Sequence, residues 1–395
     1  MFKTYIVLFK TPGGKRIASA GFIARLPIAM DTLAIILFVQ SVDGRYAIAG
    51  SLTAVAALVT VISAPLWSKA ADRLGQKSVL TITVPIRILS IFAFIVLVKN
   101  GAPIWSWFVA IFLAESASVS IGSMTRRRWV HLIDEGKKDL LSTSYAFESL
   151  LDELIFILGP VMTTVVVAII SPAAGLLLGV FFLIIGAPIL AAHTKSDPGV
   201  EYHNQGDKLK SVFRSQKLQA IAIPLTIAGG SFSAVTICVI AFSDERGFKS
   251  ISGLLLGIWA AGGAISALVN GSITWKVSHG TRFLLYLNGM TLTALSFPFI
   301  NSFWLLGVAL FLQGICIAPL LPNGLPLITN SVSPSRMTQA ITLATAGIPL
   351  TGAMSSFLSG RLIDSYGAST ALWLPFGFLV LSSATTIPYL KQYRD

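Results

Sequence analysis

The stretch PLWSKAADRLGQKSVL, residues 65–80, places a short charged segment between two apolar runs. Lys69, Asp72, Arg73 and Lys77 lie close together in a chain of which only 12% of the residues are charged. A charged connection of this kind, flanked by apolar sequence on both sides, is typical of the loop between two membrane-spanning helices.

The composition of the rest of the chain agrees with a membrane setting. Hydrophobic residues make up 54% of the 395 residues and the mean hydropathy is +0.78, whereas a soluble domain has about 25% charged residues. A spanning helix needs about 20 mainly apolar residues. We predict twelve spans, at roughly 17–40, 46–68, 79–98, 103–124, 142–170, 173–192, 218–241, 251–274, 282–300, 303–326, 337–359 and 369–389. These runs do not alternate with the period of a β-barrel strand, so we expect an all-α polytopic membrane protein without a soluble domain.

The distribution of basic residues predicts the topology. About 22 of the 29 lysines and arginines fall in the segments that would face the cytoplasm if the N-terminus does, and about five fall in the opposite loops. We therefore expect a multi-pass protein of the bacterial inner (plasma) membrane with both termini cytoplasmic. The apolar run near the N-terminus is too short for a cleaved signal peptide. The net charge of +12 follows from topology and gives no reason to expect nucleic acid as a partner.

One connection is longer and more polar than the others. Residues 193–217 separate six predicted spans on each side, so we expect an N-terminal half over residues 1–192, a cytoplasmic central loop, and a C-terminal half over residues 218–395. A faint repeat supports this division, because GQKSVL at 75–80 follows the second span and GTRFLL at 280–285 follows the eighth.

The motif DRLGQK at 72–77, placed between the second and third of twelve spans, resembles the signature loop of the major facilitator superfamily. Further stretches resemble a group of largely actinobacterial permeases described as efflux carriers: AGFIARLPIAM (20–30), ESLLDELIFILGP (148–160), SGLLLGIWAAGGA (252–264) and AGIPLTGAMSSFLSGRLIDSYG (346–367). The resemblance implies the major facilitator fold, a monomer in membrane lipid, and transport of a small molecule by alternating access without a cofactor.

The same resemblance assigns the charged loop to a cytoplasmic gate. Asp72 would lie against the N-terminal end of a helix from the other half, near Arg336, where the helix dipole favours an anion. Gly75 would permit the tight turn, and Arg73 and Lys77 would pair with acids or lipid phosphates. The alternative is an ordinary basic loop on the cytoplasmic side.

Four charged residues fall within predicted spans: Arg25, Arg87 and Glu115 near mid-depth, and Asp31 deeper toward the outer face. A charge in the hydrocarbon costs roughly 2.5–3.5 kcal/mol on insertion scales, so each marks a candidate functional group. Arg25 and Asp31 are six residues apart, about 120° around a helix, and therefore need different partners. We predict that these four residues couple transport to protons; a purely structural set of salt bridges is the alternative.

The fifth predicted span contributes three further acids. Glu148 and Asp152 are four residues apart and share one helix face, with Glu153 beside them. They suit either a gate or structural pairing with nearby arginines, or direct proton carriage.

The candidate substrate-binding residues come from the spans that line the cavity in the family. They are neutral and polar: Ser231, Ser233, Thr236, Gln313 and Asn323. The sequence has no phosphate-binding loop and no HExxH motif, and its four histidines lack metal-ligand spacing. We therefore expect neither an enzyme nor a metal site, and a transporter driven by protons or another ion.

Three functions fit these patterns. We expect a proton-coupled exporter of an amphipathic or cationic compound, because acids outnumber arginines in the predicted spans. The alternatives are proton-coupled uptake of a sugar or an organic anion, and a receptor or scaffold that uses the carrier fold without transport.

The topology can be tested with reporter fusions. A reporter inserted at Thr194 and another placed after Asp395 should both give a cytoplasmic signal, because both sites follow an even number of predicted spans. An external signal from either fusion would contradict the twelve-span arrangement.

Overall fold

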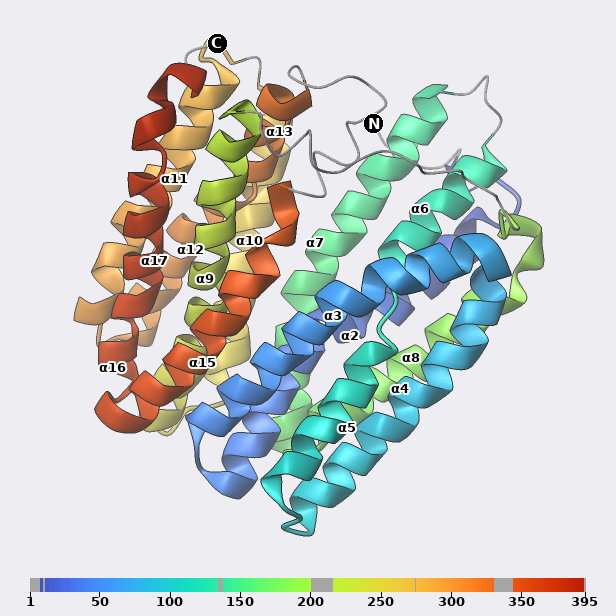
Figure 1. The fold of residues 1–395 in the computed structure, drawn as a ribbon, viewed down its shortest axis with the longest axis horizontal. Coiled ribbons are helices and arrows are strands. Elements are labelled where there is room, and N and C mark those ends of the chain that lie inside the picture. The colour runs from blue at the N-terminus through green and yellow to red at the C-terminus, as the bar shows by residue number, and fades with distance from the viewer. Residues whose placement is uncertain are drawn as a thin grey trace. The chain divides into compact units, whose positions relative to one another are not determined.

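The computed structural model describes residues 8–9, 11–133, 138–199, 216–273, 275–329 and 344–393. Within these ranges every regular element is a helix and none is a strand, which confirms the all-α prediction. The chain divides into two compact units, and Figure 1 labels their helices. The first unit contains residues 1–42 and 59–204, and the second contains residues 43–58 and 205–395.

The boundaries between the units fall after residues 42, 58 and 204, and the second of them lies within a helix. The helix α3 runs without interruption over Tyr46–Leu74, yet its first part belongs to the second unit and its remainder to the first. The sequence-based halves kept this helix whole.

The first unit follows the order of the first six predicted spans. Its helices are α2 (Gly14–Asp43), the later part of α3, α4 (Gln76–Lys99), α5 (Ile104–Ser116), α6 (Ile121–Leu132), α7 (Lys138–Ile169) and α8 (Ala174–Ala192), followed by the 3-10 turn η1 (Thr194–Ser196). Helix α2 is largely buried. It packs closely on α8, because a Cβ placed on Gly186 would lie 2.4 Å from the backbone nitrogen of Ala24.

The fourth predicted span is two helices rather than one. Helix α5 ends at Ser116 and α6 begins at Ile121, so the chain leaves the helical path over residues 117–120 (Figure 1). A break exposes carbonyl groups that a continuous helix would pair. The Ser63 hydroxyl donates to the carbonyl of Glu115 at 2.8 Å, and the Trp67 indole donates to that of Ser116 at 2.6 Å.

The second unit contains the remaining helices and the start of α3. They are α9 (Gln216–Glu245), α10 (Ile251–Ser272), α11 (His279–Ser296), η3 (Phe297–Phe299), α12 (Phe303–Ile317), α13 (Leu320–Thr329), α15 (Ile348–Tyr366), α16 (Ala368–Ala371), α17 (Trp373–Ala384) and η5 (Ile387–Tyr393). The predicted span at 337–359 begins outside the described residues, and the one at 303–326 is divided between α12 and α13.

Polar contacts explain why residues 43–58 belong to the second unit. The carboxylate of Asp364 in α15 accepts hydrogen bonds from the backbone nitrogens of Tyr46 and Ala47 at 2.8 and 2.7 Å. These are two of the donors that the first turn of a helix leaves unpaired. The Tyr46 hydroxyl donates to Asp244 at the end of α9 at 2.8 Å. The beginning of α3 is therefore held by side chains of α9 and α15.

The length and hydropathy of the helices agree with a membrane protein. Among the described residues, nine helices or helix pairs are long and apolar enough to cross a membrane, and the bent pair Ala368–Ala384 with Ile387–Tyr393 brings the number to ten. Helices α11 and α15 correspond to the ninth and eleventh predicted spans and are not among the ten.

Glycines set the distance between α10 and α12 in the second unit. A Cβ on Gly262 would lie 2.3 Å from the carbonyl oxygen of Phe311, and one on Gly314 would lie 2.1 Å from that of Trp259. Both clashes are with backbone atoms, which cannot move aside as the end of a flexible side chain can. Gly377 in α17 differs, because a Cβ there would meet no atom within 4 Å.

This contrast gives a matched pair of substitutions. Gly262→Ala should lower the free energy of unfolding by about 1–3 kcal/mol, because α10 and α12 must move apart to admit the methyl group. Gly377→Ala makes the same chemical change in open space and should leave the stability unchanged or raise it by up to about 1 kcal/mol. SDS titration of the purified protein measures both, and equal effects would contradict the packing argument.

Candidate functional site

Arg87 of α4 lies between two carboxylates within the first unit. Its Nη2 donates to Asp31 of α2 at 2.5 Å and to Glu115 Oε1 at 3.1 Å, and its Nη1 lies 3.3 Å from Glu115 Oε2. The three side chains are between 7% and 15% exposed. The sequence singled out all three residues, and the structure brings them together as one triad.

The charges of this triad do not balance. Arginine remains protonated in proteins, so two ionised carboxylates around Arg87 leave one negative charge in excess. An uncompensated charge is costly away from water. The triad would become neutral by binding one proton or one cation.

Thr60 of α3 is a fourth member that the sequence analysis did not identify. Its hydroxyl donates to Glu115 Oε2 at 2.8 Å. The available signal was the spacing of Thr60, Ser63 and Trp67, which places three hydrogen-bonding side chains on one face of an otherwise apolar helix.

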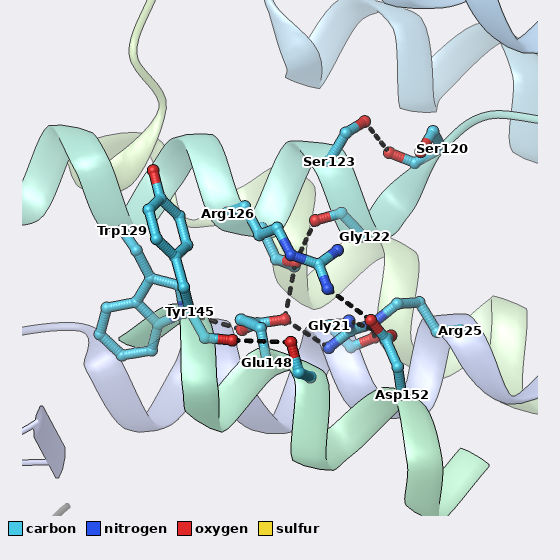
Figure 2. A network of polar contacts seen from close by, with 12 residues as sticks. Gly21, Arg25, Ser120, Gly122, Ser123, Arg126, Trp129, Tyr145, Glu148 and Asp152 are labelled. Carbon is cyan, nitrogen blue, oxygen red and sulfur yellow. Dashed lines mark hydrogen bonds and ion pairs between the residues drawn. The ribbon is translucent and has the colours of Figure 1, made fainter. Parts of the chain in front are cut away.

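A second network surrounds Arg25 of α2 (Figure 2). Its Nη2 lies 2.7 Å from Glu148 Oε2, its Nη1 donates to Asp152 Oδ1 at 2.7 Å, and its Nε donates to the carbonyl of Gly21 at 2.9 Å. Arg25 and Glu148 are almost completely buried, whereas Asp152 is 34% exposed.

Residues of α6 complete this second network. Arg126 donates to Asp152 Oδ2 at 2.5 Å, while Thr125 and Trp129 donate to the two oxygens of Glu148 at 3.1 and 2.7 Å. Two arginines face two carboxylates, so the network is balanced without a proton. Figure 2 shows these side chains from α2, α6 and α7 converging on one point.

The four predicted coupling residues therefore belong to two different networks. Arg25 joins the acids of α7, and Asp31 joins Arg87 and Glu115. The 120° separation of Arg25 and Asp31 on α2 places their side chains on different faces. Glu153 is half-buried and belongs to neither network among the described residues.

The charged loop at 72–77 takes its contacts within the first unit. Asp72 forms an ion pair with Arg127 of α6, and Arg336 lies outside the described residues. Gly75, with φ of +80°, makes the turn that begins α4. Lys77 donates its backbone nitrogen to Asp197 at 3.3 Å. Arg73 is exposed.

Arg128 is a buried residue that the sequence analysis treated only as part of a basic loop. It donates to Gln76 Oε1 at 2.7 Å, to the carbonyl of Leu190 at 2.8 Å and to the Ser196 hydroxyl at 2.9 Å. It thereby joins the start of α4 to the end of α8. Partial burial, followed by the charges of Arg128 and two other basic residues, lowers the pKa of the neighbouring His193.

Arginines 126, 127 and 128 are consecutive, yet each has a different partner. Successive residues of a helix point about 100° apart. On α6 this sends one arginine to α7, one to the end of α3, and one to the start of α4 and the end of α8.

The five predicted substrate-binding residues are distributed over α9, α12 and α13 of the second unit. Within the described residues, Gln313 is buried with both amide atoms unpaired, and Ser231 Oγ and Asn323 Oδ1 also lack a hydrogen-bond partner. Thr236 donates to the carbonyl of Phe232 in its own helix, and Ser233 is half-buried. The described residues contain no group of three or more potential metal ligands.

The chain matches the family model of the Major Facilitator Superfamily over residues 17–301 and 277–393. It therefore belongs to this superfamily, and it is a membrane transporter rather than an enzyme. No curated protein matches its sequence.

Several solved transporters share its fold. The nucleoside transporter NupG has a TM-score of 0.75 at 13% identity, over 95% of this chain and 98% of that one. A POT family transporter in complex with a thioalcohol-conjugated peptide has a TM-score of 0.72 at 12% identity, over 96% of each chain. The human organic anion transporter MFSD10 (TETRAN) has a TM-score of 0.61 at 13% identity, over 94% and 99%.

The charge argument predicts how Arg87 contributes to stability. Arg87→Gln should lower the free energy of unfolding by about 3–5 kcal/mol, because it leaves two carboxylates close together without a cation. Adding Asp31→Asn to Arg87→Gln should recover part of this loss. Arg73→Gln, which alters an exposed arginine of the same unit, should change stability by less than about 0.5 kcal/mol. SDS titration measures all three variants, and equal losses for Arg73→Gln and Arg87→Gln would contradict the argument.

Proposed function

We propose that this chain is a proton-coupled secondary transporter that exports a small amphipathic or cationic compound across a bacterial cell membrane. The observation that carries the proposal is the pairing of Arg87 with two carboxylates, Asp31 and Glu115, in largely buried positions of three helices. The proposal places both termini in the cytoplasm and treats the protein as a monomer.

Proton coupling requires a group that is charged in one state and neutral in another. The triad carries one negative charge in excess when both acids are ionised, so binding a single proton makes it neutral. The Arg25 network is already balanced by Arg126, and gaining a proton would give it a net positive charge. We therefore assign coupling to Asp31 and Glu115, and a structural or gating role to Glu148, Asp152 and Glu153.

The same excess charge supports exchange of a proton for a cationic substrate. A cation near the triad and a proton on one of its acids would compensate the same negative charge, so each would displace the other. Competition of this kind makes the inward movement of a proton drive the outward movement of a cation. The resemblance of the chain to efflux permeases agrees with this direction.

The neutral polar groups of the substrate are assigned to neutral polar residues of the second unit. The central parts of α9, α10 and α12 contain no Asp, Glu, Lys or Arg, whereas Ser231, Gln313 and Asn323 have buried polar atoms that find no partner among the described residues. Buried polar atoms of proteins are usually hydrogen-bonded. These atoms are therefore available to a substrate that carries hydroxyl, amide or carbonyl groups.

The unpaired amide of Gln313 also supports a second candidate function. A sugar presents many hydroxyl groups and needs neutral donors and acceptors, so proton-coupled uptake of a sugar would use the same residues. A receptor or scaffold on this fold would need no charge excess at the triad.

Transport in inverted vesicles with an imposed pH gradient tests the proposal. Ethidium serves as the cationic probe, within a panel that includes labelled sugars and organic anions. Glu115→Gln and Asp31→Asn should each reduce gradient-driven accumulation to at most about one tenth of the wild-type level, while exchange without a gradient stays measurable, because the amide resembles the protonated acid.

Asp43→Asn provides a matched control. Asp43 lies on the same helix as Asp31 and pairs with the exposed Arg45 at the helix end, so this variant should accumulate the probe like the wild type. Wild-type accumulation by both triad variants would overturn the assignment of the coupling site. Flux of a sugar or an organic anion, without flux of any cation, would favour the uptake alternative.

A further inference from the structure

Helix α3 contacts the end of α5 through three side chains on one face. Thr60, Ser63 and Trp67 all donate hydrogen bonds to Glu115 or Ser116, at 2.8, 2.8 and 2.6 Å. The spacing of three and four residues aligns them along the helix. This row of bonds attaches α3 to the break that follows α5.

The three hydrogen bonds differ in the kind of acceptor. Ser63 and Trp67 donate to backbone carbonyls, whose hydrogen-bonding capacity does not depend on protonation. Thr60 donates to the carboxylate itself, at Oε2 of Glu115, and that oxygen also lies 3.3 Å from Arg87 Nη1. Thr60 is therefore the contact of this row whose strength depends on the charge of Glu115.

The hydroxyl of Thr60 has an alternative partner in its own helix. A threonine in a helix can donate to the carbonyl three or four residues earlier, which here belongs to Ala57 or Ala56. A hydrogen bond to an ionised acceptor is roughly twice as strong as one between neutral groups. Ionised Glu115 favours the bond across to α5, and protonated Glu115 makes the bond within α3 competitive.

We propose that Thr60 is a positioning residue through which α3 responds to the protonation of Glu115. It strengthens the contact of α3 with α5 while Glu115 is ionised and weakens this contact when Glu115 binds a proton. The inference rests on the proposed function, because it takes Glu115 as a proton site. It adds a route for the response, since residues 46–58 of α3 belong to the second unit and the rest of the same helix belongs to the first.

The charged groups around Glu115 are few, which simplifies the test. Arg87 contacts it from α4, and Asp31 reaches it through Arg87 from α2. The part of α3 that contacts Glu115 offers a hydroxyl and no ionisable group. A change at Thr60 therefore alters hydrogen bonding to Glu115 without altering any charge.

The experiment uses the full chain in lipid nanodiscs and the proton as the probe, so it does not depend on knowing the substrate. Infrared difference titration follows the protonated-carboxyl signal, which the Glu115→Gln variant assigns to Glu115. Thr60→Val removes the hydroxyl with little change in shape. It should move the midpoint of that signal upward by about one pH unit, a tenfold change in proton affinity.

Conservative and matched variants separate this effect from a structural one. Thr60→Ser retains the hydroxyl and should restore the wild-type midpoint. Thr53→Val makes the same exchange on the same helix, where the hydroxyl donates to the carbonyl of Gly50 at 3.0 Å, and it should not move the midpoint. Ser63→Ala should also leave the midpoint in place, because its bond goes to a carbonyl.

Hydrogen exchange tests the weakening of this contact of α3 directly. In the wild type, amides of residues 59–74 should exchange faster below the midpoint than above it. In Thr60→Val the same amides should exchange at the faster rate both below and above the midpoint. If Glu115 titrates but Thr60→Val keeps the wild-type midpoint, or if exchange in the wild type does not vary with pH, the role of Thr60 is wrong and the proposed function stands. If Glu115 does not titrate, the role of Thr60 is wrong, and if Asp31 does not titrate either, the proposed function is overturned as well.

Discussion

One guanidinium group between two carboxylates is the interaction on which the first unit depends. Arg87 reaches Asp31 and Glu115 only if α2, α4 and α5 keep their registers to within a fraction of a turn. Moving charges out of water is costly, and this cost is recovered only when the geometry is good and the remaining hydrogen bonds are made. The break after α5, with its carbonyls paired to Ser63 and Trp67, positions Glu115 at this point. The local irregularity and the buried charge are thus parts of one arrangement.

The two networks differ by a single cation, and this difference separates their roles. Arg25 and Arg126 balance Glu148 and Asp152, so that network gains nothing from a proton. Among the residues that the structure describes, the triad has no second cation that corresponds to Arg126. Three helices supply its charged groups, and a fourth, α3, adds the hydroxyl of Thr60. The buried negative charge of the triad is a physical reason to expect that it binds a proton or a cation. The balanced charges of the Arg25 network are a physical reason to expect that it keeps its helices in place.

The sequence could predict the helices and the buried charges but not the pairing between them. Runs of apolar residues are a local property, and each predicted span corresponds to a helix or helix pair in the described residues, although the eleventh begins outside them. The mid-span charges were equally visible. Their partners depend on packing between helices: Arg25 was grouped with Arg87, and only the structure shows that it joins the acids of α7. Residues 117–120 and Thr60 were missed because a short break and a lone hydroxyl barely change local hydropathy. Arg128 was missed because buried and exposed arginines look alike in a basic loop.

The separation of charged and neutral groups between the units constrains any coupling mechanism. The proposed proton site lies in the first unit, and the neutral polar residues assigned to the substrate lie in the second. A ligand shifts a conformational equilibrium only by binding one state better than the other, so the proton must change a contact that differs between states. The chain passes between the two units after residues 42, 58 and 204, and the second of these points lies within α3. At its beginning, Tyr46 donates hydrogen bonds to Asp364 and Asp244 of the second unit. In its later part, Thr60 donates to Glu115 of the first unit. A helix with polar attachments in both units can carry a change at Glu115 from one unit to the other without a charge crossing the protein.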